Sequence, residues 1–229
     1  STAATLRDVV AAVASAGARA ARTVPDARAT SAEPPRTPSA LLGDLLATAA
    51  PWLPIRDAAQ LRAAHPGAAD DEIADALVAR AATVTSGIGA ATGGLSAAHW
   101  LAPASLLALP LELGAETLLT AAVEVVLLGE LHELHGRPAR GDARARALAY
   151  LASWTQQRAV DEAVVPGLGA VLGSAGLRTL SRRMTRRMAR SVPGAAPFLV
   201  CAALGGRANR RATEALARRV LADLRRSRS

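Results

Sequence analysis

The sequence predicts an all-α fold, a multi-helix bundle with glycine-rich helical hairpins. Three observations support this. Hydrophobic residues make up 51% of the 229-residue chain, and many of them are the helix formers Ala and Leu. Aromatic residues amount to only 2%, and the strand formers Tyr, Phe and Ile are scarce. No segment shows a convincing alternation of period two, so a sheet is not expected.

The sequence predicts an N-terminal tail that is followed by a single domain. Residues 5–22 form a weak amphipathic helix, interrupted by Gly17, whose apolar face holds Leu6, Val9, Val10 and Val13. Residues 23–40 are rich in Pro, Ser, Thr and Ala, a composition that is typical of a linker. We therefore expect a poorly ordered tail over residues 1–38 and one α-helical domain over residues 39–229.

Two helices are predicted next. The first begins near Ser39 and ends at Pro51 and Pro54, and its apolar face holds Leu41, Leu42, Leu45 and Leu46. The second has Asp70 or Asp71 as its cap, with acidic residues at the positive end of the helix dipole. Its buried stripe is predicted to be Ile73, Leu77, Ala81 and Val84.

Residues 81–111 contain no Lys, Arg, Asp or Glu. The run exceeds the roughly 20 apolar residues that a bilayer span needs, but polar residues, glycines and prolines interrupt it. We favour a core hairpin of two helical pieces, broken around Gly93–Gly94 and Pro103 and packed through small residues, for which Gly89-xxx-Gly93 has suitable spacing. A membrane span over residues 84–109 is the alternative.

From about Ser105 the pattern is helical again, as far as the stop signal at Gly136. Glu112, Glu116 and Glu130 fall within about 40° of each other on this helix. Glu124 and Glu133 lie to either side. Such an acidic stripe predicts a surface helix of a bundle rather than a bilayer span. A further helix is expected, with Asp142 as its N-cap. Its inward face is predicted to hold Leu148, Leu151 and Trp154.

One cluster has metal-ligating residue types: Glu130, His132, Glu133 and His135. The two histidines are three positions apart instead of the four of H-E-x-x-H, and no further ligands can be named. We expect no metal and no cofactor. The chain contains no nucleophile elbow, phosphate-binding loop or dinucleotide fingerprint, so we expect a non-enzymatic protein. An enzyme acting on a lipid or other apolar ligand inside the bundle is an alternative without assignable residues.

The basic residues, all Arg, concentrate in residues 137–229, where the net charge is +14. Two helices in this region are amphipathic. On residues 177–192, Leu177, Leu180, Met184 and Met188 oppose a half of the circumference that holds Arg178, Arg182, Arg183, Arg186, Arg187 and Arg190. On the last helix, Leu216, Val220 and Leu224 oppose Arg207, Arg210, Arg211, Arg218, Arg219 and Arg225.

Basic amphipathic helices suit the surface of anionic membranes. We therefore predict docking on anionic lipid or an acidic partner through Arg178, Arg182, Arg183, Arg186, Arg187, Arg190, Arg207, Arg210 and Arg211. The bland alternative is that these arginines are merely solvated. Nucleic-acid binding ranks lower, because only Phe198 could stack on bases in this region and no binding fold is recognisable.

Three segments resemble EcsC-like proteins, a bacterial family named for a gene neighbour of an ABC exporter. They are the glycine-rich residues 81–119, residues 133–153, and residues 186–219, where Pro193, Gly194 and Asn209 match the closing pattern. The resemblance covers about residues 70–225. It implies a helical protein that is membrane-associated or cytoplasmic, and it transfers no catalytic residues. No signal-peptide pattern is visible, and the single Cys201 lies in an apolar setting. We expect a cytoplasmic location, peripheral at the inner face of the cell membrane.

Overall fold

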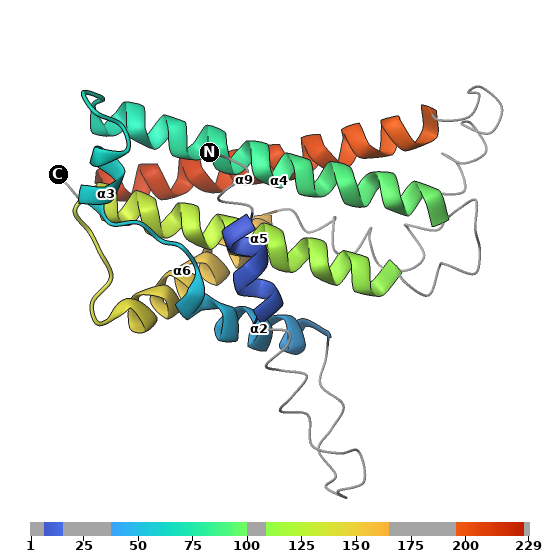
Figure 1. The fold of residues 1–229 in the computed structure, drawn as a ribbon, viewed down its shortest axis with the longest axis horizontal. Coiled ribbons are helices and arrows are strands. Elements are labelled where there is room, and N and C mark those ends of the chain that lie inside the picture. The colour runs from blue at the N-terminus through green and yellow to red at the C-terminus, as the bar shows by residue number, and fades with distance from the viewer. Residues whose placement is uncertain (1–6, 16–37, 100–108, 165–195, 227–229) are drawn as a thin grey trace, which may run out of the picture.

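The computed structural model describes residues 7–15, 38–99, 109–164 and 196–226, and every regular element in these ranges is helical. The predicted all-α bundle is therefore confirmed. A short helix over residues 7–15 comes first. The other elements are α2 (Pro38–Ala49), the 3₁₀ helix η1 (Ala50–Trp52), α3 (Ala58–Ala63), α4 (Asp70–His99), α5 (Leu109–Leu134), α6 (Ala143–Val164) and α9 (Ala196–Arg226). Figure 1 shows α4, α5 and α9 running side by side across the length of the bundle.

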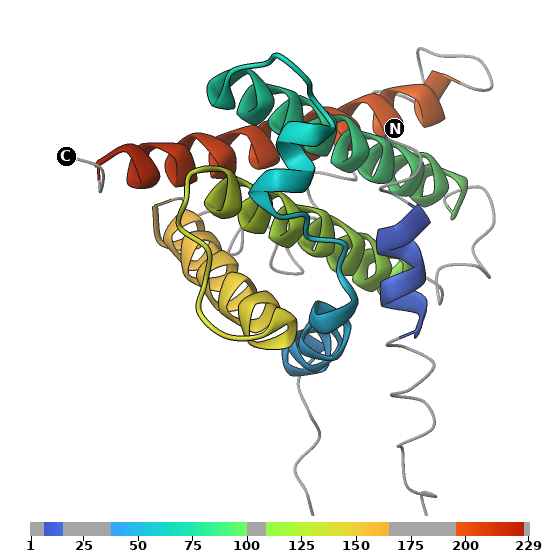
Figure 2. The ribbon, with the colours of Figure 1, turned by 60° about the vertical axis from the view of Figure 1, so that its left-hand side comes forward.

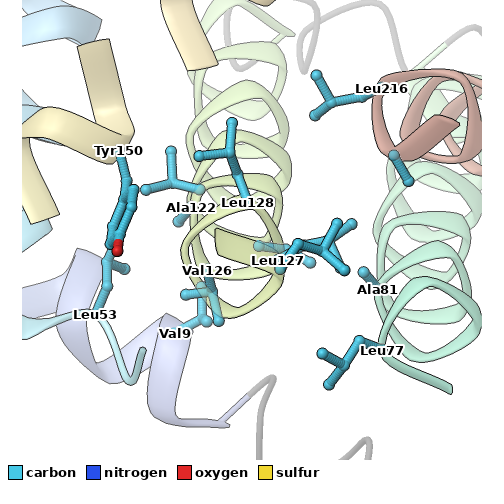
Figure 3. Close-up of a cluster of buried hydrophobic side chains, with 14 of the residues drawn as sticks. Val9, Leu53, Leu77, Ala81, Ala122, Val126, Leu127, Leu128, Tyr150 and Leu216 are labelled. Atoms are coloured by element: carbon cyan, nitrogen blue, oxygen red, sulfur yellow. The ribbon is translucent and has the colours of Figure 1, made fainter. Parts of the chain in front are cut away.

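Helix α5 is the central element. It packs against α4, α6, α9, α2 and α3, and all residues from 121 to 131 are buried. In Figure 3, Val126 is directed toward Val9, whereas Leu127 on the other side is directed toward Leu77 and Ala81. A helix that is covered on all sides needs apolar residues around its whole circumference, and α5 has them.

The predicted acidic surface stripe on α5 is wrong. Glu124 and Glu130 are 0% and 1% exposed, and Glu133 is buried as well. Each of these carboxylates meets an arginine from another element, which compensates for the loss of water. Glu116 is half-buried, and the side chain of Glu112 lies outside the described residues.

Helix α4 is continuous from Asp70 to His99, so the predicted break at Gly93–Gly94 is also wrong. Two glycines weaken an isolated helix by about 2 kcal/mol in total, but α4 is supported by α9 along its length. The expected buried stripe of α4 is confirmed at Ile73, Leu77, Ala81 and Val84. Pro103 lies outside the described residues, and α5 begins at Leu109, so Pro110 falls in its first turn, where proline is tolerated.

Small residues bring α4 and α9 into close contact. The sequence predicted close packing of the glycine-rich segment within its own hairpin, whereas in the described residues Gly89 contacts α9. A Cβ atom placed on Gly89 would lie 2.6 Å from the carbonyl oxygen of Gly205. A Cβ atom on Gly206 would lie 2.9 Å from the carbonyl oxygen of Ser86. The two backbones therefore approach each other to a distance that no larger side chain allows.

The predicted stop and start signals between α5 and α6 are confirmed. Gly136 has φ +70° directly after α5, and the Asp142 carboxylate accepts a hydrogen bond of 2.8 Å from Ala145 N at the start of α6. The predicted inward face of α6 is confirmed at Leu151 and Trp154, which pack against the core. It is wrong at Leu148, which is exposed, whereas Ala147, about 100° away around the helix, and Tyr150 are buried.

The segment over residues 7–15 belongs to the packed structure. Val9 and Ala12 are buried and Val13 packs against the core, whereas Val10, which was predicted on the same face, is exposed. The core of the bundle thus reaches beyond the predicted domain 39–229. In the described part of the chain, no helix combines the length and the hydropathy needed to cross a bilayer.

Candidate docking face on helix α9

Helix α9 has an inner and an outer face. Leu216, Val220 and Leu224 are buried on the inner face, as predicted. The outer face is exposed at Val200, Leu204, Arg207, Arg211 and Arg218. At 100° per residue, these five positions fall within about 60° of one another. We call this stripe of five residues the outer face of α9.

The outer face carries arginines whose charge is not compensated within the described residues. Arg207, Arg211 and Arg218 are exposed and make no ion pair or side-chain hydrogen bond there. By contrast, the guanidinium of Arg210 pairs with Glu214 at 2.8 Å, and that of Arg225 approaches Asp71 at 3.5 Å. Of the predicted binding residues, Arg207 and Arg211 thus lie on the outer face with no carboxylate partner among the described residues, whereas Arg210 lies beside it and pairs with Glu214.

The apolar end of α9 is exposed too. Leu199, Val200 and Leu204 are 69%, 38% and 48% exposed. These residues belong to the first turns of α9, which begins at Ala196. In Figure 2 this end, drawn in orange, lies apart from the green end of α4. The exposed surface of α9 therefore changes along the helix from apolar to basic.

The inner face is held by polar contacts that the sequence analysis missed. Asn209 Nδ2 donates to Glu116 Oε1 at 2.9 Å and to the carbonyl oxygen of Thr85 at 3.3 Å. One turn further, the Thr213 hydroxyl donates to Glu124 Oε1 at 2.8 Å. Because the Thr213 hydroxyl donates its only proton to Glu124, it accepts a hydrogen bond from the Thr85 hydroxyl, which is 2.9 Å away.

Glu124 is the centre of this network. Its other oxygen accepts hydrogen bonds from Trp154 Nε1 at 2.8 Å and from Arg158 Nε at 3.0 Å, and Arg158 forms an ion pair with it. The network thus joins α4, α5, α6 and α9, and every lone-pair direction of the buried carboxylate has a donor. We infer that it fixes the rotation of α9 and hence the direction of its outer face.

Two further buried glutamates hold the other elements to α5. Glu130 pairs with Arg56, at 2.7 Å, and with Arg80. Glu133 accepts hydrogen bonds of 3.0 Å from Arg146 and from the Tyr150 hydroxyl. The Tyr150 oxygen in turn accepts from Ala139 N at 3.0 Å. The isolated glutamates in an otherwise apolar helix were the sequence signal for this arrangement.

Tyr150 permits a direct check of this interior. Burial raises its pKa to about 12. The unfolded chain has a pKa of about 10, so the folded state holds the proton more tightly and stability falls as the pH rises from about 10 to 12. Because the chain has one tyrosine, phenolate absorbance reports it alone. We expect a midpoint near 12 in buffer and near 10 in urea; equal midpoints would contradict the buried hydrogen bond to Glu133.

The side chains of Glu130, His132, Glu133 and His135 are not grouped around a common point that a metal ion could occupy. Glu130 and Glu133 are engaged by arginine, and the Nδ1 atoms of His132 and His135 lie 2.8 Å and 2.9 Å from carbonyl oxygens of their own helix. Burial lowers the pKa of His132. Within the described ranges, no three His, Cys, Asp or Glu side chains are grouped as metal ligands would be.

The remaining predicted binding residues, Arg178, Arg182, Arg183, Arg186, Arg187 and Arg190, lie outside the described residues. Comparison with family models, with curated proteins and with solved structures gives no match. The resemblance to EcsC-like proteins therefore stays a prediction from the sequence.

Proposed function

We propose that this is a non-enzymatic, membrane-associated helical protein of the EcsC-like type, which docks on anionic lipid through the outer face of α9. The proposal rests on the alignment of Arg207, Arg211 and Arg218 on one face of a helix whose other face is fixed in the bundle. All three are exposed, and none has an ion pair with another described residue. The proposal extends to the predicted arginines of residues 177–192. It gives the protein a place at the cytoplasmic face of the cell membrane, where anionic headgroups are available.

The expected strength follows from the charges. Each Arg near an anionic bilayer contributes about 1 kcal/mol, so the three arginines together contribute about 3 kcal/mol, or roughly a factor of 100 in partitioning. The planar guanidinium also forms paired hydrogen bonds with phosphate oxygens. Because the side chains are exposed, docking requires no unfolding of the bundle.

The test compares two variants with the same change in net charge. One reverses the outer face (Arg207→Glu, Arg211→Glu, Arg218→Glu). The matched control reverses three arginines elsewhere in the protein that are also exposed and make no ion pair among the described residues (Arg7→Glu, Arg140→Glu, Arg144→Glu). Binding is measured by flotation with phosphatidylcholine vesicles, with and without phosphatidylserine, and circular dichroism checks the helical fold.

We expect the wild type to float only with anionic vesicles and to dissociate as salt is added, because screening shortens the range of the attraction. Reversing the outer face should weaken binding by roughly 100-fold, while the control loses far less. Equal losses in both variants would overturn the proposal, since net charge would then suffice. Binding to polyglutamate or duplex DNA but not to vesicles would favour an acidic partner or nucleic acid instead.

A further inference from the structure

We infer that the N-terminal end of α9 inserts Leu199, Val200 and Leu204 into the acyl-chain region of the membrane. This inference rests on the proposed function and deepens it: the three arginines bind headgroups, and the apolar end selects a lipid bilayer over any other anionic surface.

The apolar residues form a cluster at one place. The other large hydrophobic side chains that are exposed in the described part of the chain lie on other elements: Val10 by itself, and Trp52 and Leu148 where they line one pocket between η1 and α6. Scattered apolar residues are normal on a protein surface. Three within six consecutive positions, at one end of a helix, are a local concentration. A membrane would remove from water the apolar area that this end now exposes.

The spacing fits a helix that lies in the interface. With a rise of 1.5 Å per residue, Val200 and Leu204 are about 10 Å and 5 Å from Arg207 along the axis. Interfacial helices bury their apolar face about 5–10 Å into the boundary between headgroups and acyl chains. Because Val200, Leu204 and Arg207 share one face, a tilt of the helix that lowers its N-terminal end toward the membrane places the apolar end deeper than the arginines. The arginines then remain at the level of the phosphates.

The adjoining charges indicate what covers this end. An apolar patch next to three uncompensated arginines complements a surface that is anionic outside and apolar beneath, which is the structure of an anionic bilayer. A nucleic acid or an acidic polypeptide satisfies the arginines but offers no apolar interior. The two contributions also respond differently to salt, since screening weakens the charges and leaves apolar burial intact.

The first experiment removes the apolar end without changing any charge. The variant Leu199→Ser, Val200→Ser, Leu204→Ser is compared with the control Val10→Ser, Leu148→Ser, which alters exposed apolar residues elsewhere. Burying one aliphatic side chain contributes about 1.5–3 kcal/mol, so we expect at least about tenfold weaker binding to phosphatidylserine-containing vesicles. The loss should grow in high salt, where the wild type depends on apolar contact. The control should bind as the wild type does.

The second experiment measures depth. In a Cys201→Ser background, an environment-sensitive fluorophore is attached to Leu204→Cys or, as the control, to Leu148→Cys. We expect vesicles with spin-labelled acyl chains to quench the probe at position 204 and not the probe at position 148. If the serine variant binds like the wild type and neither probe is quenched, insertion is refuted.

The two proposals fail separately. If reversal of the outer face abolishes binding while the apolar variant binds normally, docking through the arginines is supported and insertion of the apolar end is contradicted. If the wild type does not bind anionic vesicles, both fall.

Discussion

Replacing Glu130 by Leu is expected to lower the free energy of unfolding by about 3–5 kcal/mol, the usual effect of removing one partner from a buried ion pair. Glu130 is almost fully buried between the guanidinium groups of Arg56 and Arg80. Burial already lowers the pKa of Arg80, which means that its charge is held there against an unfavourable environment. Without the carboxylate, two cations face each other with nothing between them.

Urea unfolding followed by circular dichroism measures this effect, and two variants bracket it. Glu214→Ala removes a glutamate whose ion pair with Arg210 is exposed, and should change stability by less than about 1 kcal/mol. Replacing the whole triad (Arg56→Met, Arg80→Met, Glu130→Leu) should recover most of the loss, because no uncompensated charge remains. A Glu130→Leu variant no less stable than Glu214→Ala would contradict the buried triad.

The second large effect is expected at the contact between α4 and α9. Gly205→Ala should lower the free energy of unfolding by about 1–3 kcal/mol, the range for overpacked sites. The new Cβ would meet the backbone carbonyl of Gly89, which cannot rotate away as a side chain would. The helices would have to separate, and the hydrogen bonds of Asn209 to Glu116 and Thr85 would lengthen.

Gly87→Ala is the matched control for this contact. Gly87 lies on α4 as well, but a Cβ there meets nothing within 4 Å. Alanine should therefore raise stability by up to about 1 kcal/mol through helix propensity alone. Urea unfolding of both variants separates the two cases. If Gly205→Ala and Gly87→Ala shift stability in the same direction, the close approach of the two helices is not present in solution.

Several features of the fold were predictable because they are coded locally. Gly136 ends α5 and Asp142 begins α6 through contacts within a few residues, and the buried stripe of α4 follows from its own periodicity. The glycine-rich packing was predictable from small-residue spacing. Helix α3 was not predicted, since it has only six residues and its cap, Asp57, bonds to Gln60 without a strong hydrophobic pattern.

The buried glutamates could not be predicted from periodicity. Arg56 and Arg158, which meet Glu130 and Glu124, are 74 and 34 positions away in the sequence. The local sequence pattern alone therefore predicted that the glutamates form a solvent-exposed stripe. The continuity of α4 through Gly93–Gly94 likewise depends on α9, whose start is about a hundred residues further along the chain. Tertiary contacts decided both features.

The sequence predicted the basic residues of the candidate site, but not which apolar residues beside them are exposed. The exposure of Arg207 and Arg211 followed from the amphipathic pattern of the last helix. The pairing of Arg210 with Glu214 was a helical i, i+4 contact that the pattern also contained. That Leu204 is exposed rather than packed depends on how α9 packs against the other helices, which the local sequence does not determine.

The most direct test of docking by the outer face is the ratio of two partition coefficients on phosphatidylserine-containing vesicles. They are those of the outer-face reversal (Arg207→Glu, Arg211→Glu, Arg218→Glu) and of its charge-matched control (Arg7→Glu, Arg140→Glu, Arg144→Glu). Both proteins carry the same net charge, so the ratio reports only where the charges lie. The outer face of α9 predicts that the control binds at least about tenfold more tightly than the reversal. A ratio of one would contradict it.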